Sequence, residues 1–258
     1  MNPEYEQKGY FIVRSLYKKN ELQELREVLL KFHELWKHKN AELYAKRAIN
    51  SAYLTSTEYL DSAKREVLFK FIGSTRIMDV VYSIIPENPV FVNTQLFFNP
   101  VNKDQKNYWH RDPQYHLSLE EQKEALNGPN ALHFRLALED EPGVELIPGT
   151  HKNWDTKEEL DIRLEQSDRK SHEDIRTGVK IELATGDLLV FSANMIHRGL
   201  YGMDRFAFDL LFGDPAPELM EFVQDDCLPN QEIINKLEDP TAFLTTIKLR
   251  NTFKGRKQ

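Results

Sequence analysis

Two residues with metal-binding side chains stand two positions apart in the segment Trp109-His110-Arg111-Asp112-Pro113. In an extended segment, side chains two positions apart point to the same side, so His110 and Asp112 would face one side together and Arg111 the other. A neutral imidazole nitrogen and a carboxylate oxygen form half of a site for a divalent metal. A second histidine from a distant strand would complete the set of two His and one carboxylate that binds Fe(II) and leaves positions open for a co-substrate and oxygen.

The candidate for the missing ligand is His197, which lies just past the apolar run of a strand that Gly186 and Asp187 open. Position alone does not favour His197 over a structural histidine. The other histidines have structural interpretations as well: solvated helix positions (His33, His38), a solvated insertion (His172), a turn (His151), a hydrogen-bonded core position beside Arg135 (His133) and a place close to the ligand pair that could support it (His116).

The first third of the chain has the spacing of helices. Apolar residues recur at steps of three and four over residues 20–45, which predicts an amphipathic helix with Asn20 as a candidate N-cap. A second helical stretch covers Ser62–Ile85, with Gly73 as a candidate break. These helices must pack against something apolar, which the middle of the chain supplies.

From residue 90 the pattern changes to short runs rich in Val, Ile and Phe and bounded by Gly, Pro, Asn and Asp, which is typical of strands. Because no regular helix alternates with them, we expect an antiparallel sandwich or barrel and not a parallel α/β sheet. Ser118 and Glu121 have the spacing of a capping box at the start of a short helix. The charged residues 152–176 predict an exposed insertion. The expected strands are Val90–Phe98, Ala131–Leu138, Val144–Ile147, Val179–Leu183, Asp187–Ser192 and Phe206–Phe212.

These patterns predict one domain over residues 1–258, mainly β with flanking α-helices. Its parts are a helical N-terminal part at about 1–88, a β core at about 89–213 and a helical tail at about 214–258. No composition shift marks a boundary between domains.

Composition narrows the functional class. The formal net charge of -7 argues against a protein built to grip nucleic acid, and no polybasic patch suggests membrane binding. The N-terminal residues lack the apolar run of a secretory signal, and the single cysteine, Cys227, cannot form an internal disulfide. We therefore expect a cytoplasmic protein that acts on small molecules, with its oligomeric state open.

Four blocks of the sequence, in order, resemble the phytanoyl-CoA dioxygenase family of Fe(II)/2-oxoglutarate oxygenases. GYFIVRSLYKKNELQELREVL resembles the opening strand and helix of that family, and NYWHRDPQYH its His-x-Asp segment. LALEDEPGVELIPGTHK resembles the strand and turn that follow, and GDLLVFSANMIHRG the strand with the distal histidine. The resemblance implies a double-stranded β-helix, or jelly roll, which agrees with the β-rich middle and helical ends.

The resemblance also implies roles for residues. His110, Asp112 and His197 would be the catalytic residues that bind Fe(II). Because a carboxylate is present at Asp112, where related halogenases have a small residue, hydroxylation is favoured over halogenation. Arg205 matches the arginine that holds the distal carboxylate of the co-substrate 2-oxoglutarate, a task suited to a guanidinium.

Further residues are weaker candidates for the pocket. Asn93 and Gln95 share one face of their strand and are candidates for contacts to 2-oxoglutarate or substrate, or else solvated amides of an edge strand. The remaining alternatives stay open. Arg198 is a competing candidate for the role of Arg205, and Arg205 could instead form an ion pair with Asp204 or Asp209. His133 and Arg135 could bind an anionic substrate or pair with acidic neighbours. Trp109 could line the metal site or belong to the core.

Two other functions remain open at this stage. Arg205 follows His197 by eight residues, a shorter spacing than in the family, which would suit a metal-dependent oxygenase with another co-substrate. A non-catalytic jelly-roll binding protein is the third reading. The sequence does not identify the substrate.

Overall fold

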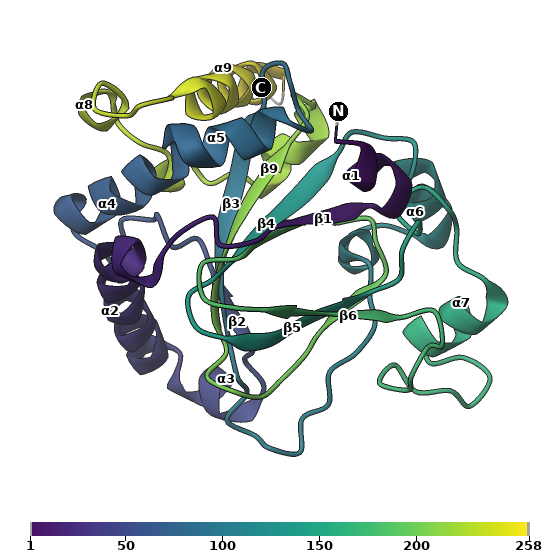
Figure 1. Cartoon of the computed structure of the whole chain (residues 1–258). Coiled ribbons are helices and arrows are strands. Elements are labelled where there is room, and N and C mark those ends of the chain that lie inside the picture. The colour runs from purple at the N-terminus through teal and green to yellow at the C-terminus, as the bar shows by residue number, and fades with distance from the viewer. Residues whose placement is uncertain (1, 257–258) are drawn as a thin grey trace.

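The computed structural model describes residues 2–256, with side chains to residue 253, and has a β core in two layers (Figure 1). Within these residues, one antiparallel sheet has the strand order β1-β7-β4-β9-β3-β2 and a second has the order β6-β5-β8. The strands are β1 (Tyr10–Val13), β2 (Asn50–Ala52), β3 (Val90–Phe98), β4 (Ala131–Ala137), β5 (Glu141–Leu146), β6 (Val179–Leu183), β7 (Leu188–Ser192), β8 (His197–Gly199) and β9 (Phe206–Gly213).

Helices cover the outer face of the larger sheet (Figure 1). The α-helices are α1 (Pro3–Lys8), α2 (Gln23–Lys39), α3 (Ala41–Lys46), α4 (Ser62–Ile72), α5 (Thr75–Tyr82), α6 (Leu119–Ala125), α7 (Lys157–Arg163), α8 (Gln231–Ile234) and α9 (Thr241–Arg256). Short 3-10 helices span Lys19–Leu22, Asp112–Tyr115, Pro217–Phe222 and Asp225–Cys227.

Alternation along the central strands separates an apolar face from a polar one. On β4, Phe134 faces outward into the main core, where it meets Phe212 of β9, while His133 and Arg135 face inward. The outer face packs against side chains of α2, α4 and α5, such as the fully buried Phe32 of α2. Burial of such large side chains is the main favourable term holding helices and sheet together.

The inner face of the larger sheet meets the smaller sheet. A second apolar cluster lies between them and includes Leu189 and Phe191 of β7 with Val144 and Leu146 of β5. Two antiparallel sheets packed face to face with helices outside form the predicted double-stranded β-helix, or jelly roll. The polar residues of the inner face lie between these layers, where they need partners.

Most predicted elements are confirmed, with shifts at their ends. All six expected strands are present, Gly73 separates α4 from α5, and Ser118 caps α6 through the predicted box with Glu121. The N-cap prediction for Asn20 is wrong, because Asn20 lies inside a 3-10 helix and Leu22 precedes α2. The predicted helix over 20–45 is divided into α2 and α3.

The prediction of an exposed insertion over residues 152–176 holds for only part of the segment, because many of its residues are exposed but others are buried. This segment contains α7, and Glu159, Ile162, Arg163 and Ile175 are buried within it. The charged residues hid this packing because Asp155 pairs inside the protein with Arg163 of the same segment and with Arg111.

The helices described in residues 2–256 include none that is both long enough and apolar enough to cross a membrane.

Candidate metal centre

Backbone pairing brings the candidate ligands together. His110 and His197 form an isolated antiparallel bridge: the N–H of His110 donates to the carbonyl of His197 at 3.0 Å, and the reverse bond measures 2.9 Å. The N–H of Asp112 donates to the carbonyl of Ala193 at 3.1 Å, which ties the second ligand to the turn before β8. The segment carrying His110 and Asp112 thus runs beside the strand carrying His197.

The three side chains converge on one point. One ligand atom from each of His110, Asp112 and His197 lies within 4.8 Å of the others. Oδ1 of Asp112 is 3.5 Å from Nε2 of His110 and 3.6 Å from Nε2 of His197. These separations leave room for one ion among the three atoms.

The opposite ring nitrogen of each histidine faces a backbone carbonyl. Nδ1 of His110 lies 3.2 Å from the carbonyl of Tyr108, and Nδ1 of His197 lies 3.0 Å from the carbonyl of Met195. Because a carbonyl can only accept, each Nδ1 carries the proton and each Nε2 presents its lone pair. This is the arrangement that orients histidines as metal ligands.

The charge states suit a divalent ion. Burial, and then the neighbouring His110, lowers the pKa of His197 to about 3, and burial also lowers the pKa of His110. Burial alone would raise the pKa of the Asp112 carboxyl, but His133 and the two other histidines together hold it well below its usual range. At neutral pH the site therefore presents two neutral imidazoles and one carboxylate.

His133 holds the carboxylate ligand from behind. Its Nε2 lies 2.7 Å from Oδ2 of Asp112, its Nδ1 lies 3.2 Å from Oδ2 of Asp209, and its ring stacks on Phe191 at 4.7 Å between centroids. Burial would lower the pKa of His133, but the carboxylates of Asp112 and Asp209 raise it to about 9, so both nitrogens donate. Since Oδ2 of Asp112 is taken, Oδ1 is the oxygen left for a metal.

Arg135 continues this buried chain of charges. Its guanidinium makes a bidentate ion pair with Glu141 at 2.8 and 2.9 Å and lies 3.4 Å from Asp209. His133 and Arg135 thus pair with acidic neighbours, the simpler of the two readings of the sequence. The contact between His133 and Asp112 was not foreseen, although the shared strand face of His133 and Arg135 was the available signal.

Arg205 lies beside this chain and retains unused donors. Its side chain is fully buried, Nη1 donates to the carbonyl of Phe98 at 3.0 Å, and Nε is 3.6 Å from Glu141. Among the described residues, Nε and Nη2 have no hydrogen-bond acceptor. Burial, and then Arg135, lowers its pKa to about 10, so it stays charged at neutral pH. A buried cation with two free donors fits the carboxylate of a bound ligand.

Gly199 makes room for this guanidinium. It lies two positions after His197 on β8, and a Cβ there would come within 2.6 Å of Nη2 of Arg205. Gly199 was not predicted as a site residue, and its only signal was a glycine on the same strand face as a predicted ligand. The packing places the guanidinium of Arg205 next to the strand that carries His197.

The two amide candidates differ in availability. Asn93 is buried, and its side-chain oxygen accepts the N–H of Thr94 at 2.7 Å, so part of its capacity is used locally. Gln95 is half-buried and sits opposite Asp209 in the register of β3 and β9. Both belong to the inner, polar face of the larger sheet.

Arg198 and Trp109 point away from the ligands. Arg198 pairs with Glu145 and Asp174 and stacks on Trp109 at 4.5 Å. Trp109 is fully buried in a cluster with four isoleucines. The packing therefore gives Trp109 a core role and Arg198 a structural one, and Arg198 does not compete with Arg205.

Aromatic rings flank the exposed side of His110. The rings of Tyr108 and Tyr115 lie 5.1 and 5.6 Å from the His110 ring, and the Tyr115 hydroxyl donates to that of Tyr108 at 3.1 Å. Tyr115 is about half exposed, at 52%. In the sequence, only the closeness of Tyr108 and Tyr115 to the His-x-Asp segment pointed to this pair.

Comparisons with known proteins agree with the metal site that the geometry indicates. The family model for phytanoyl-CoA dioxygenase matches residues 5–200. A comparison with curated proteins gave no match.

Solved structures share the fold at low sequence identity. AviO1 from Streptomyces viridochromogenes is 14% identical, with a TM-score of 0.57 over 83% of this chain and 93% of its own. HygX from Streptomyces hygroscopicus, solved with nickel and 2-oxoglutarate, is 14% identical, with a TM-score of 0.58 over 83% and 87%. EctD from S. alaskensis, solved with 2-oxoglutarate and 5-hydroxyectoine, is 14% identical, with a TM-score of 0.56 over 82% and 74%.

The family model covers most of the chain, including all three candidate ligands. Two neutral imidazoles and a carboxylate on one side of an ion are the donor set of non-haem Fe(II) oxygenases. This chain therefore belongs to the phytanoyl-CoA dioxygenase family of non-haem Fe(II)- and 2-oxoglutarate-dependent oxygenases.

Proposed function

We propose that this chain hydroxylates a small-molecule substrate, with Fe(II) held by His110, Asp112 and His197. The observation that carries the proposal is the approach of both Nε2 atoms to Oδ1 of Asp112, at 3.5 and 3.6 Å. When bound, Fe(II) with 2-oxoglutarate supplies an oxidation by dioxygen that the protein's side chains cannot perform. The chain's own residues bind and orient the reacting groups.

Each residue of the centre has a distinct task in this proposal. His133 holds Oδ2 of Asp112, so that the carboxylate presents a single oxygen to the ion. The backbone carbonyls behind His110 and His197 keep both rings in the metal-binding tautomer. Arg205 receives the distal carboxylate of 2-oxoglutarate through the two N–H groups that lack protein acceptors, with Gln95 and Asn93 as further candidates on the same inner face.

A direct assay tests the metal role. Wild-type protein with Fe(II), 2-oxoglutarate and ascorbate should release succinate even without substrate, and His197→Ala should abolish this release. His38→Ala is the matched control, because His38 is exposed on α2 and should leave the rate unchanged. Absence of succinate from wild-type protein across several substrate panels would contradict the proposal and favour a non-catalytic binding protein.

A second variant tests the co-substrate role. Arg205→Ala should weaken 2-oxoglutarate binding by roughly 10–100-fold, the range expected for losing a hydrogen bond to a charged group. Arg65→Ala is the control, because Arg65 donates to the carbonyls of Thr55 and Asp226, outside the centre. Unchanged affinity in Arg205→Ala would move the co-substrate elsewhere and favour an oxygenase with another co-substrate.

We also propose a cytoplasmic location. Cys227 is the only cysteine of the chain, and it is free and buried. Proteins of oxidising compartments more often carry paired cysteines.

A further inference from the structure

Three side chains alternate with the metal ligands and point away from the centre. Trp109 and Arg111 flank His110, and Arg198 follows His197. All three are buried, with 0%, 1% and 3% of their surface exposed. They are covered by residues 150–178, which we call the outer brace and which include α7.

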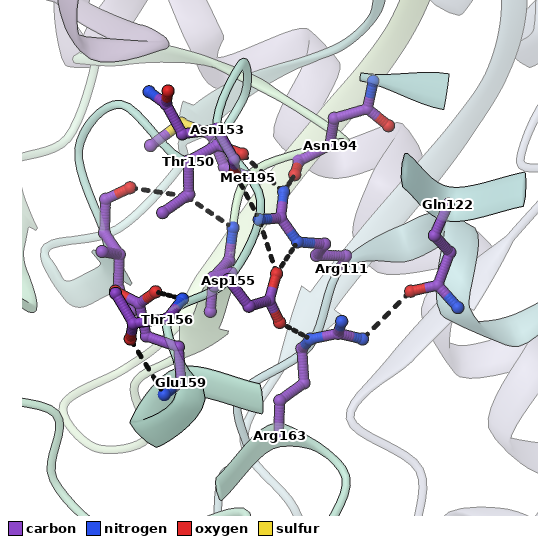
Figure 2. Close-up of polar contacts among 12 residues, drawn as sticks. Arg111, Gln122, Thr150, Asn153, Asp155, Thr156, Glu159, Arg163, Asn194 and Met195 are labelled. Atoms are coloured by element: carbon purple, nitrogen blue, oxygen red, sulfur yellow. Dashed lines mark hydrogen bonds and ion pairs between the residues drawn. The ribbon is translucent and has the colours of Figure 1, made fainter. Parts of the chain in front are cut away.

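Arg111 reaches across to the brace and to the turn before His197. Its Nε donates to Oδ1 of Asp155 at 2.8 Å, and Nη2 donates to the carbonyl of Asn153 at 2.9 Å. Nη1 donates to the carbonyls of Thr150 and Asn194 (Figure 2). One guanidinium thus links the segment between two ligands to the turn that leads into the third.

The contacts close into a ring. Oδ2 of Asp155 accepts Nε of Arg163 at 2.8 Å, and Arg163 Nη1 donates to Gln114 at 2.9 Å and to Gln122 at 3.1 Å. The same oxygen of Gln114 accepts the backbone N–H of Arg111 at 3.2 Å. Figure 2 shows Asp155 lying between the two guanidinium groups. The side chains of the two arginines and the aspartate are 0–1% exposed.

The outer brace also binds the other two outward side chains, Trp109 and Arg198, through hydrogen bonds and an ion pair. Trp109 Nε1 donates to the carbonyl of Glu173 at 2.9 Å, and its backbone N–H donates to the carbonyl of Ser171 at 2.8 Å. Arg198 donates to the carbonyl of His172 at 2.9 Å and pairs with Asp174. Trp109, Arg111 and Arg198 are therefore all hydrogen-bonded to the same segment.

We propose that the outer brace positions the metal ligands, with Arg111 as the positioning residue and Asp155 as the group that locks it. The proposal rests on the proposed function, since it takes the ion to lie among His110, Asp112 and His197. Backbone pairing sets which residues lie opposite each other, but ligand groups must be held to within about 0.5 Å by side chains that are themselves locked. Asp155 locks Arg111 because two buried cations share its carboxylate.

The chain offers a matched pair of variants for the test. Asp155→Asn removes the charge from the lock without touching a ligand. Asp187→Asn makes the same change at a carboxylate that is also buried and also paired with an arginine, Arg14, at 2.6 Å. Asp187 precedes β7, at the end of that strand away from His197.

The readout is the affinity of the metal-free protein for Mn(II), measured from the free Mn(II) signal in electron paramagnetic resonance. Asp155→Asn should bind Mn(II) roughly 10-fold more weakly than wild type, the lower end of the range for removal of a group that hydrogen-bonds a ligand directly, because Asp155 acts through Arg111. Asp187→Asn should bind Mn(II) as wild type does, although both variants lose thermal stability. Equal Mn(II) affinity in Asp155→Asn and wild type, or equal weakening in both variants, would overturn the proposal.

A milder variant decides the matter if Asp155→Asn does not fold. Gln122→Ala removes one acceptor from Arg163 while leaving the ion pairs in place, and it should still weaken Mn(II) binding measurably. Wild-type affinity in Gln122→Ala would then count against the brace. Failure of the wild-type protein itself to bind Mn(II) would contradict the proposed function, which separates the two claims.

Discussion

Asp112 presents one oxygen to the centre because His133 occupies the other. Residue type and spacing, which are local properties, nominated His110 and Asp112, whereas His197 was nominated only by the family resemblance of the ordered sequence blocks. The sequence could not assign His133 to Asp112, because that contact joins a residue of β4 to a residue of a 3-10 helix 21 positions away. Long-range contacts of this kind decide which buried polar groups serve the site and which serve the core.

Gly199 offers a test of Arg205 that leaves the ligands in place. Gly199→Ala would put a Cβ within 2.6 Å of the Arg205 guanidinium and displace it. We expect weaker 2-oxoglutarate binding, by roughly 10-fold for the loss of about 1.4 kcal/mol, and unchanged Mn(II) affinity. Calorimetric titration of each ligand measures both quantities. Unaltered 2-oxoglutarate binding would separate Arg205 from the co-substrate.

The buried His33 should lower the free energy of unfolding in acid. Burial against Phe98 and Tyr44 lowers its pKa from the ordinary 6.5 to about 4. The unfolded chain therefore binds a proton at His33 more readily than the folded chain. The contribution of the neutral His33 to stability is fully present above pH 6.5 and is lost as the pH falls toward 4. The loss should reach up to about 3 kcal/mol.

Denaturant unfolding at several pH values checks this prediction, with His33→Phe as the comparison. The variant keeps an aromatic ring and removes the titrating group, so its stability should fall less steeply between pH 6.5 and 4. The same slope in both proteins would show that His33 does not carry the effect.

At the scale of elements, the sequence predicted what is long or periodic. Strand β3 matches its predicted bounds because its nine residues, with Val and Phe at both ends of the run and no Gly or Pro inside it, leave little ambiguity. Strands β2 and β8 have three residues each, too short for a pattern, and are fixed by their partners β3 and β5. The buried part of the outer brace was missed because a charged residue such as Asp155 is paired inside the protein, here with Arg111 and Arg163.

The start of α7 provides a test of the brace as a folded element. Thr156 accepts the N–H of Glu159, and Glu159 accepts the N–H of Thr156, so Thr156→Ala removes a capping box. We expect a loss of about 1 kcal/mol and faster amide hydrogen exchange over residues 157–163. Asp61→Ala, which removes the cap of α4, is the control and should leave exchange in α7 unchanged. If amide exchange over residues 157–163 is as slow in Thr156→Ala as in Asp61→Ala, the predicted effect of the cap on α7 is contradicted.

At the scale of the whole molecule, the jelly roll follows from alternation. Apolar residues on the outer face of the larger sheet, such as Phe134, pack against the helices. Residues on its inner face, such as His133, line the space between the two sheets. The sequence predicted this class from the strand-like runs and the family resemblance. It could not predict the buried chain from Asp112 to Arg205, which assembles only when β4, β5 and β9 pack together.

Ligand binding should stabilise the whole domain. A ligand at 100 times its Kd adds about 2.7 kcal/mol to the free energy of unfolding, which raises Tm by roughly 5–10 °C for a chain of this size. Mn(II) with 2-oxoglutarate should produce such a shift in wild-type protein and not in His197→Ala. A similar shift in the variant would indicate binding outside the centre.

The most direct test of the central claim is a calorimetric titration of 2-oxoglutarate into a protein solution free of dioxygen, with and without Mn(II). A metal held by His110, Asp112 and His197, with Arg205 nearby, predicts one 2-oxoglutarate bound per chain when Mn(II) is present and much weaker binding without it. Equal binding with and without the metal, or none in either case, would contradict the account.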